Sequence, residues 1–131
     1  MRLIGNTLGV LVLLFGLSGP ALAADLEVNI AGLKDGVVQP HAQLGPVVIV
    51  TLATNGFQMK DFTKATAVND GEGHVHIWLD NQTFNTLTAE PAWVFGGVTP
   101  GKHTLSVELV RNNHTPLSPP VKKTITFTMT K

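Results

Sequence analysis

The chain has 131 residues, among them nine lysines and arginines, nine acidic residues and five histidines, and it contains no cysteine. The lack of cysteine excludes disulfides, thiolate nucleophiles, zinc fingers and iron–sulfur clusters, so any metal must be held by histidine, carboxylate, methionine or backbone oxygen. The formal net charge is +0 and there is no run of basic residues, which argues against nucleic acid and anionic membranes as partners.

The beginning of the chain has the pattern of a secretory signal peptide. A positive charge at the second position precedes an apolar run over residues 8–17, and Ala21 and Ala23 are the small residues that signal peptidase requires. The apolar run is about half of the ~20 residues that a membrane span needs. We therefore expect cleavage of residues 1–23, one domain over residues 24–131, a periplasmic or secreted location, and no stable membrane insertion.

The rest of the chain predicts β-structure nearly throughout. Apolar residues alternate with polar ones or form short β-branched runs, and turns rich in Pro, Gly, Asn and Asp separate them. In chain order, the predicted strands are centred on residues 26–30, 47–53, 75–79, 105–109 and 125–129. Residues 57–68 fit either one short helix or a loop. This spacing is typical of an all-β fold, an immunoglobulin-like or cupredoxin-like antiparallel sandwich of about seven strands.

Four of the five histidines fall in three short stretches near the ends of predicted strands. His74 and His76 lie in the first stretch, and Val75 between them is predicted to face the core, so the two histidines share the opposite face of their strand. Neighbours of this kind lie ~6.5–7 Å apart along a strand. Two imidazoles can then converge on one ion, and imidazole is the commonest protein ligand for metals. The alternative is that both are polar residues on a solvated sheet face.

His103 and His114 are further candidates, each with an alternative. His103 shares its parity with Leu105 and Val107, which predicts the core side of its strand. Because it begins that strand, it can instead lie at the rim of the sandwich and donate a ring N–H to a turn carbonyl. His114 lies in a loop, where it is either exposed or folded back beside His103. His41, in another loop, is expected to be incidental.

Taken together, residues 73–76 (GHVH), residues 100–105 (PGKHTL) and His114 resemble an uncharacterised family of small secreted bacterial β-sandwich domains. The layout of that family is Gly-His-x-His…Pro-Gly-x-His-Thr-Leu…His, and the resemblance covers about residues 68–129. It implies an exported sandwich domain and carries no established activity. It also implies one shared site made of His74, His76, His103 and His114.

The GHVH element is also similar to the strand of copper/zinc superoxide dismutase that carries a His-x-His pair of copper ligands. That enzyme uses more histidines than the five present here, a zinc loop with an aspartate ligand, and usually a disulfide. This chain has no matching zinc loop and no cysteine. The similarity therefore implies only that a His-x-His on a sandwich strand can hold copper, and not the enzyme activity.

We accordingly expect a periplasmic, non-enzymatic metal-binding domain. Copper is expected in preference to zinc, because Cu²⁺ binds nitrogen sites most tightly in the divalent series. His74, His76 and His103 are the expected primary metal ligands, with His114 as a fourth ligand or beside the site. The alternative is an immunoglobulin-like structural or protein-interaction module, in which the histidines fix turns and Trp78 or the threonines of the last strand meet a periplasmic protein partner.

Overall fold

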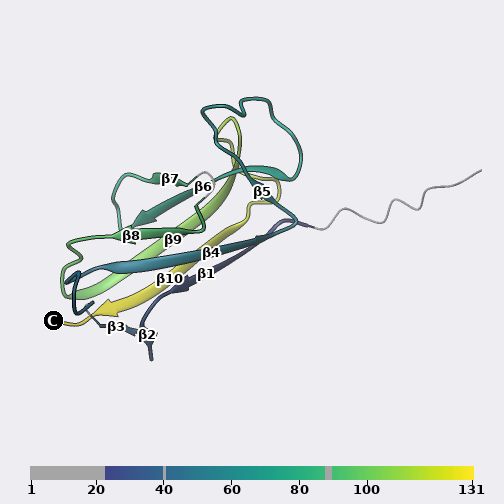
Figure 1. Ribbon diagram of the computed structural model, residues 1–131. Helices are drawn as coiled ribbons and strands as arrows, with labels where there is room; N and C mark the ends of the chain where they lie inside the picture. Colours follow the sequence, from purple (N-terminus) through teal and green to yellow (C-terminus); the bar gives the residue numbers. More distant parts are fainter. Residues whose placement is uncertain (1–22, 40, 88–89) are drawn as a thin grey trace, which may run out of the picture.

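The computed structural model describes residues 23–39, 41–87 and 90–131 (Figure 1). These residues form ten strands in two sheets and no helix, so the predicted all-β sandwich is confirmed. The predicted signal peptide over residues 1–23 lies outside the described residues, apart from Ala23. Among the described residues, no helix is long and apolar enough to cross a membrane.

The smaller sheet has three antiparallel strands in the order β1-β4-β8. They are β1 (Asp25–Ile30), β4 (Val48–Asn55) and β8 (Ala92–Phe95). The first two were expected from alternation in residues 26–30 and from the β-branched run over residues 47–53. β8 was not expected, because its apolar residues occupy only four positions between two turns.

The larger sheet has seven strands, and its long central strands pair antiparallel. Across the sheet they are β2 (Leu33–Lys34), β3 (Val37–Val38), β10 (Lys122–Met129), β9 (Gly101–Arg111), β6 (Glu72–Leu79) and β5 (Gln58–Met59), with β7 (Asn85–Leu87) also paired to β6. β3 joins β10, and β5 joins β6, in the parallel direction. With β1, β4 and β8 in one sheet and β6, β9 and β10 in the other, the strands divide as in an immunoglobulin-like sandwich.

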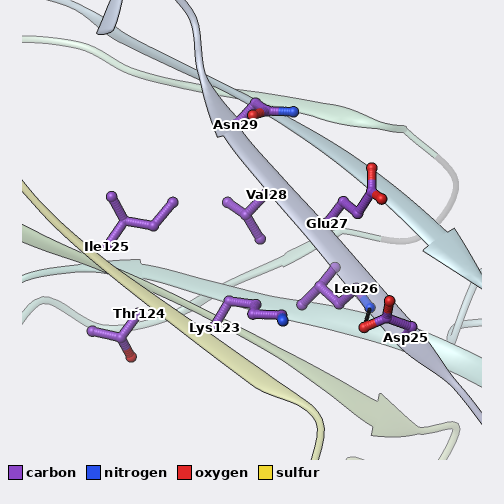
Figure 2. A pocket seen from close by; sticks show the side chains of 8 residues that line it. All are labelled: Asp25, Leu26, Glu27, Val28, Asn29, Lys123, Thr124 and Ile125. Atoms are coloured by element: carbon purple, nitrogen blue, oxygen red, sulfur yellow. Dashed lines mark hydrogen bonds between the residues drawn. The ribbon is translucent and has the colours of Figure 1, made fainter. Parts of the chain in front are cut away.

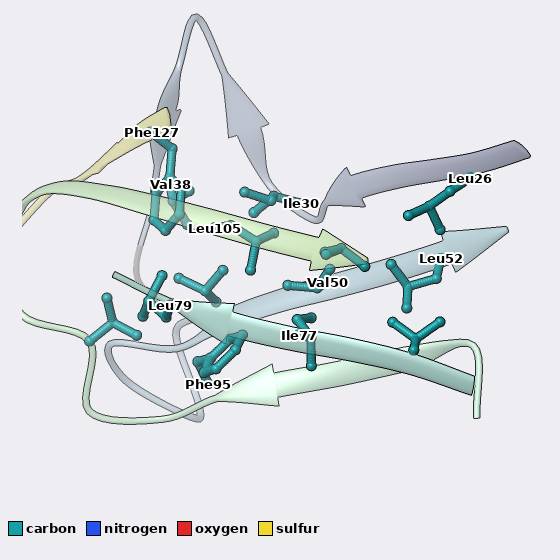
Figure 3. Packing of buried hydrophobic residues seen from close by; sticks show 14 of the residues in the cluster. Leu26, Ile30, Val38, Val50, Leu52, Ile77, Leu79, Phe95, Leu105 and Phe127 are labelled. Carbon is teal, nitrogen blue, oxygen red and sulfur yellow. The ribbon is translucent and has the colours of Figure 1, made fainter. Parts of the chain in front are cut away.

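The hydrophobic core lies between the two sheets, and every long strand contributes alternate residues to it (Figure 3). The buried core residues of the five predicted strands are Leu26, Ile30, Val48, Val50, Leu52, Val75, Ile77, Leu79, Leu105, Val107, Leu109, Phe127 and Met129. The parity expected from the sequence is therefore correct. Its consequence for the site is that the even-numbered residues of β6 face away from this core.

Residues 57–68 form a loop that begins with the two-residue strand β5, so the helix alternative is wrong. A single turn forms after β5, with the amides of Lys64 and Ala65 donating to the Asp61 carbonyl at 3.0 and 2.9 Å. The Asp61 carboxylate accepts from the amide and the hydroxyl of Thr63 at 3.0 and 2.6 Å. This is the pattern of an N-cap, so the Asp61 side chain stabilises the start of the turn, which does not continue into a helix.

Gly73 permits a very close approach of β6 to β9 at the point where the histidine pair begins. A Cβ at this position would collide with the carbonyl oxygen of Val110 and would lie 3.0 Å from the Cα of Arg111. Both neighbours are backbone atoms of the paired strand, so neither can move aside without breaking the pairing. Glycine is therefore required beside His74.

We predict that Gly73→Ala lowers the free energy of unfolding by about 1–3 kcal/mol, the usual range for overpacking. Gly96→Ala is the matched control, because a Cβ there meets nothing within 4 Å and the backbone φ is not in the left-handed region. Urea unfolding followed by Trp fluorescence measures both variants. Equal unfolding midpoints for the two would contradict the steric argument.

Candidate metal centre

His74 and His76 lie on the outer face of β6, as predicted, but that face is not solvated. The exposed fractions of the two residues are 0% and 8%. The ring of Phe62, from the loop after β5, lies 5.1 Å from the His74 ring, and the ring of Phe84 stacks on His76 at 4.1 Å with an interplanar angle of 19°. The interpretation of these histidines as surface polar residues is therefore wrong.

His114 reaches this pair from the loop between β9 and β10. Its amide donates to the Arg111 carbonyl at 2.9 Å, and the Arg111 amide donates to the Thr115 carbonyl at 2.8 Å, which closes a tight loop. The φ of His114 is +65°, in the left-handed region that few residues other than glycine adopt. His114 is exposed, as one of the two alternatives expected, and its ring lies beside His74 and His76 rather than beside His103.

Three ring nitrogens converge at one point. Nε2 of His74 lies 3.3 Å from Nε2 of His76 and 3.0 Å from Nδ1 of His114, and the last two atoms are 3.1 Å apart. Among the described residues, these three histidines form the one group of His or acidic side chains whose ligand atoms lie this close together. Ligands bound to a tetrahedral ion at ~2.0–2.1 Å are about 3.3 Å apart, so the observed spacing suits a single small metal ion.

Hydrogen bonds among the three nitrogens cannot satisfy all of them. Each imidazole nitrogen either carries a hydrogen or presents a lone pair. Of three mutually adjacent nitrogens, two must therefore be of the same kind, and that pair repels. One cation at the centre instead accepts three lone pairs at once. The three histidines, called the triad below, therefore form a group that could hold a metal ion.

Burial keeps the two histidines of β6 in the form that a metal requires. Desolvation, followed by the neighbouring His114 and His76, lowers the pKa of His74 from 6.5 to about 4. Desolvation and His114 also lower the pKa of His76. Both rings are therefore neutral at pH 7, and their nitrogens can donate to an ion without first losing a proton.

A buried polar network holds the loops of the site together, and the sequence reasoning missed it. Asn112, with 3% exposure, donates through Nδ2 to the Ala67 carbonyl at 2.7 Å and to Glu72 Oε1 at 3.0 Å. Glu72 also accepts from Asn69 Nδ2 at 2.8 Å and lies 3.7 Å from the Lys60 ammonium. These contacts join the loop after β5, the start of β6 and the loop that carries His114.

Phe62 and Phe84 were also missed as parts of the site. Phe62 contacts two of the three histidines, since its ring lies 5.0 Å from that of His114 as well as close to His74. Both phenylalanines lie in segments where polar residues and turns dominate. The available signal was that each is a large apolar side chain in a polar loop, because such a side chain is expected to pack on another surface.

His103 does not join the triad, and the predicted four-histidine site is corrected to three. Its Nε2 donates to the Thr99 carbonyl at 2.7 Å and its Nδ1 donates to Asp80 Oδ2 at 2.8 Å, so neither nitrogen has a free lone pair. Along β9 it lies seven positions from Val110, the partner of His74, which is about 23 Å. The alternative of a rim residue bonded to a turn carbonyl is the correct one.

The other residues singled out from the sequence have local roles. His41 lies in an exposed loop, where its Nδ1 accepts from the amides of Gln43 and Leu44 at 3.2 and 3.3 Å. Trp78 is half-buried on the same face of β6 as the triad, and the Lys122 ammonium lies 4.6 Å from the centre of its ring. Neither residue contributes an atom to the triad.

Comparison with known proteins adds no relative. No family model matches the chain, and neither the curated proteins nor the solved structures include a significant match. The metal interpretation therefore depends on the geometry and burial of His74, His76 and His114.

The pKa values of His103 and His74, which lie toward opposite ends of the larger sheet, are shifted in opposite directions. The hydrogen bond to Asp80 raises the pKa of His103 above 6.5, so its stabilising contribution is complete below pH ~6.5 and is lost as the pH rises through the folded-state pKa. The pKa of His74 is lowered to about 4, so the unfolded chain takes up a proton at His74 between pH ~6.5 and ~4 while the folded chain does not. Acidification through that range therefore destabilises the fold.

We predict that the metal-free protein is most stable near pH 6.5, with the free energy of unfolding falling by up to about 1.4 kcal/mol per pH unit for each buried histidine below it. Urea unfolding between pH 4.5 and 8.5 in the presence of a chelator measures this profile. In His103→Gln, the fall in the free energy of unfolding above pH ~6.5 should be smaller, and the fall below pH ~6.5 should be unchanged. A stability that rises steadily through pH 8 would contradict the assignment.

Proposed function

We propose that this protein is a periplasmic, non-enzymatic metal-binding domain that prefers copper. The observation that carries the proposal is the set of three imidazole nitrogens within 3.3 Å of one another, held by residues from β6 and the β9–β10 loop. Imidazole nitrogens suit both copper and zinc, and copper is the ion that we expect to be preferred. The signal-peptide pattern supports the location, and the family resemblance stays a prediction.

Binding rather than catalysis is proposed for two reasons. The sequence carries no Gly-x-Ser-x-Gly nucleophile elbow and no second cluster of carboxylates beside the histidines. In addition, Phe62 and Phe84 pack on rings of the triad, so aromatic side chains rather than polar catalytic groups surround its ligands. Such surroundings suit the retention of an ion.

We predict that copper raises the melting temperature of the purified protein and that His76→Ala removes most of the rise. At a free copper concentration of about 100 times Kd, the gain in stability is about 2.7 kcal/mol. His41→Ala is the matched control, because His41 is an exposed loop histidine outside the triad. Calorimetric titration should give one ion per chain, with quenching of Trp78, two residues from His76. Equal stabilisation of the wild type and His76→Ala would refute the site.

A protein-interaction module is the second candidate, and one feature of the sandwich favours it. A groove of about 440 Å³ lies between β1 and β10, with Val28 and Ile125 at its centre (Figure 2). Among the described residues, β1 pairs with β4 alone, and residues 122–126 of β10 pair with β9 alone. An extended peptide could add to these free strand edges.

Affinity capture from periplasmic extract tests this second candidate. A stoichiometric partner that is retained in the presence of chelator and lost in Val28→Lys would support it, provided that the variant keeps the circular dichroism spectrum of the wild type. Loss of the captured protein with chelator would instead assign the interaction to the metal centre.

A further inference from the structure

We propose that the histidine triad is selective for monovalent copper, Cu⁺, over Zn²⁺ and Cu²⁺; this rests on the proposed function and specifies the ion and its charge. The donor set is the first reason. All three ligand atoms are neutral imidazole nitrogens, and no carboxylate of the described residues belongs to the group. A divalent ion would therefore bring two positive charges to a set of ligands that offers no negative charge in return.

Two carboxylates on the strands that flank the triad each have a lysine beside them. Glu72, two residues before His74 on the same face of β6, lies 3.7 Å from the Lys60 ammonium and accepts hydrogen bonds from two asparagines. Glu108 is the cross-strand partner of His76, and Lys122 is the cross-strand partner of Glu108 on its other side. Glu72 is thus paired with a lysine, and Glu108 has a lysine as its cross-strand neighbour.

Burial magnifies the difference between one charge and two. His74 is 0% exposed, and Val110 opposite it is 1% exposed and lies outside the main core cluster. The rings of Phe62 and Phe84 pack on His74 and His76, so two of the three ligands are buried, while His114 is exposed. The cost of moving an ion from water into such surroundings grows with the square of its charge, so it is roughly four times larger for a divalent ion. Neutral ligands in an apolar site therefore favour Cu⁺.

The number of ligands points the same way. Three nitrogens are enough for Cu⁺, whereas Zn²⁺ almost always takes four ligands and would need a water as the fourth, and Cu²⁺ favours square-planar or tetragonal arrangements. The remaining ring nitrogen of His74, Nδ1, is buried without a hydrogen-bond partner. A ligating histidine usually gains basicity from an acceptor at that position, which strengthens its bond to divalent ions. His74 has no such acceptor.

Competition between ions tests the proposal on the purified full-length protein. Cu⁺ is supplied anaerobically with bicinchoninate as the competing chelator, and Zn²⁺ and Cu²⁺ are titrated separately and then against the Cu⁺-loaded protein. We expect one Cu⁺ per chain that is retained against about a hundredfold excess of Zn²⁺, a difference in affinity of at least two decades.

His114 offers a pair of matched variants, because Asp and Asn both tolerate the left-handed backbone that this position adopts. His114→Asp places a negative charge beside the two remaining imidazoles, and His114→Asn has nearly the same shape without the charge. We expect His114→Asp to lower the ratio of Cu⁺ to Zn²⁺ affinity by about tenfold or more relative to His114→Asn, since carboxylates select harder ions. Circular dichroism checks that both variants fold.

Each result separates this inference from the function on which it rests. If none of the three ions binds the wild type, the metal-binding function fails and the selectivity fails with it. If Zn²⁺ or Cu²⁺ binds one to one and displaces Cu⁺, the function stands and the selectivity for Cu⁺ is overturned. Equal affinity ratios in His114→Asp and His114→Asn would overturn the charge argument.

Discussion

The candidate metal centre depends on one constraint, which is that β6 is buried on both of its faces at His74 and His76. The two-residue period of the strand sends Val75 and Ile77 into the core between the sheets, where both are 0% exposed. The same period sends His74 and His76 to the opposite face, where the rings of Phe62 and Phe84 pack on them and leave them 0% and 8% exposed. An alternating strand usually has one solvated face. Here the second cover gives the histidines a low-dielectric site in which they stay neutral and ready to bind.

The third ligand is positioned by contacts between segments that are far apart in the chain. Asn112 bonds to Ala67 and Glu72, forty or more positions away, and thereby ties the β9–β10 loop to the loop that carries Phe62. His114 adopts φ +65°, a conformation that costs free energy and persists where the surrounding structure imposes it. The strained backbone lies at a ligand of the triad, which is where strain is commonly tolerated for function.

Histidine has different roles at the two ends of the larger sheet, because the pKa of His103 is raised and that of His74 is lowered. His103 bonds through its two ring nitrogens to the Thr99 carbonyl and the Asp80 carboxylate, which raises its pKa and joins the end of β6 to the β8–β9 loop. His74 has no acidic partner and is surrounded by apolar rings, so it is held neutral. Environment rather than residue identity decides which histidine bonds to a carboxylate and a carbonyl and which is left free to hold an ion.

The sequence by itself determined the fold class and the faces of the strands, because alternation in β6, β9 and β10 is a local property that the two-residue period converts directly into burial. It also placed His74 and His76 together, since residues two apart on a strand share a face. It could not place His103 or His114, because their neighbours depend on strand register and on the path of a loop. Phe62, Phe84 and Asn112 were likewise out of reach. Their contacts join segments distant in sequence, and only the tertiary structure decided that three of the four candidate histidines meet while His103 lies at the other end of β9.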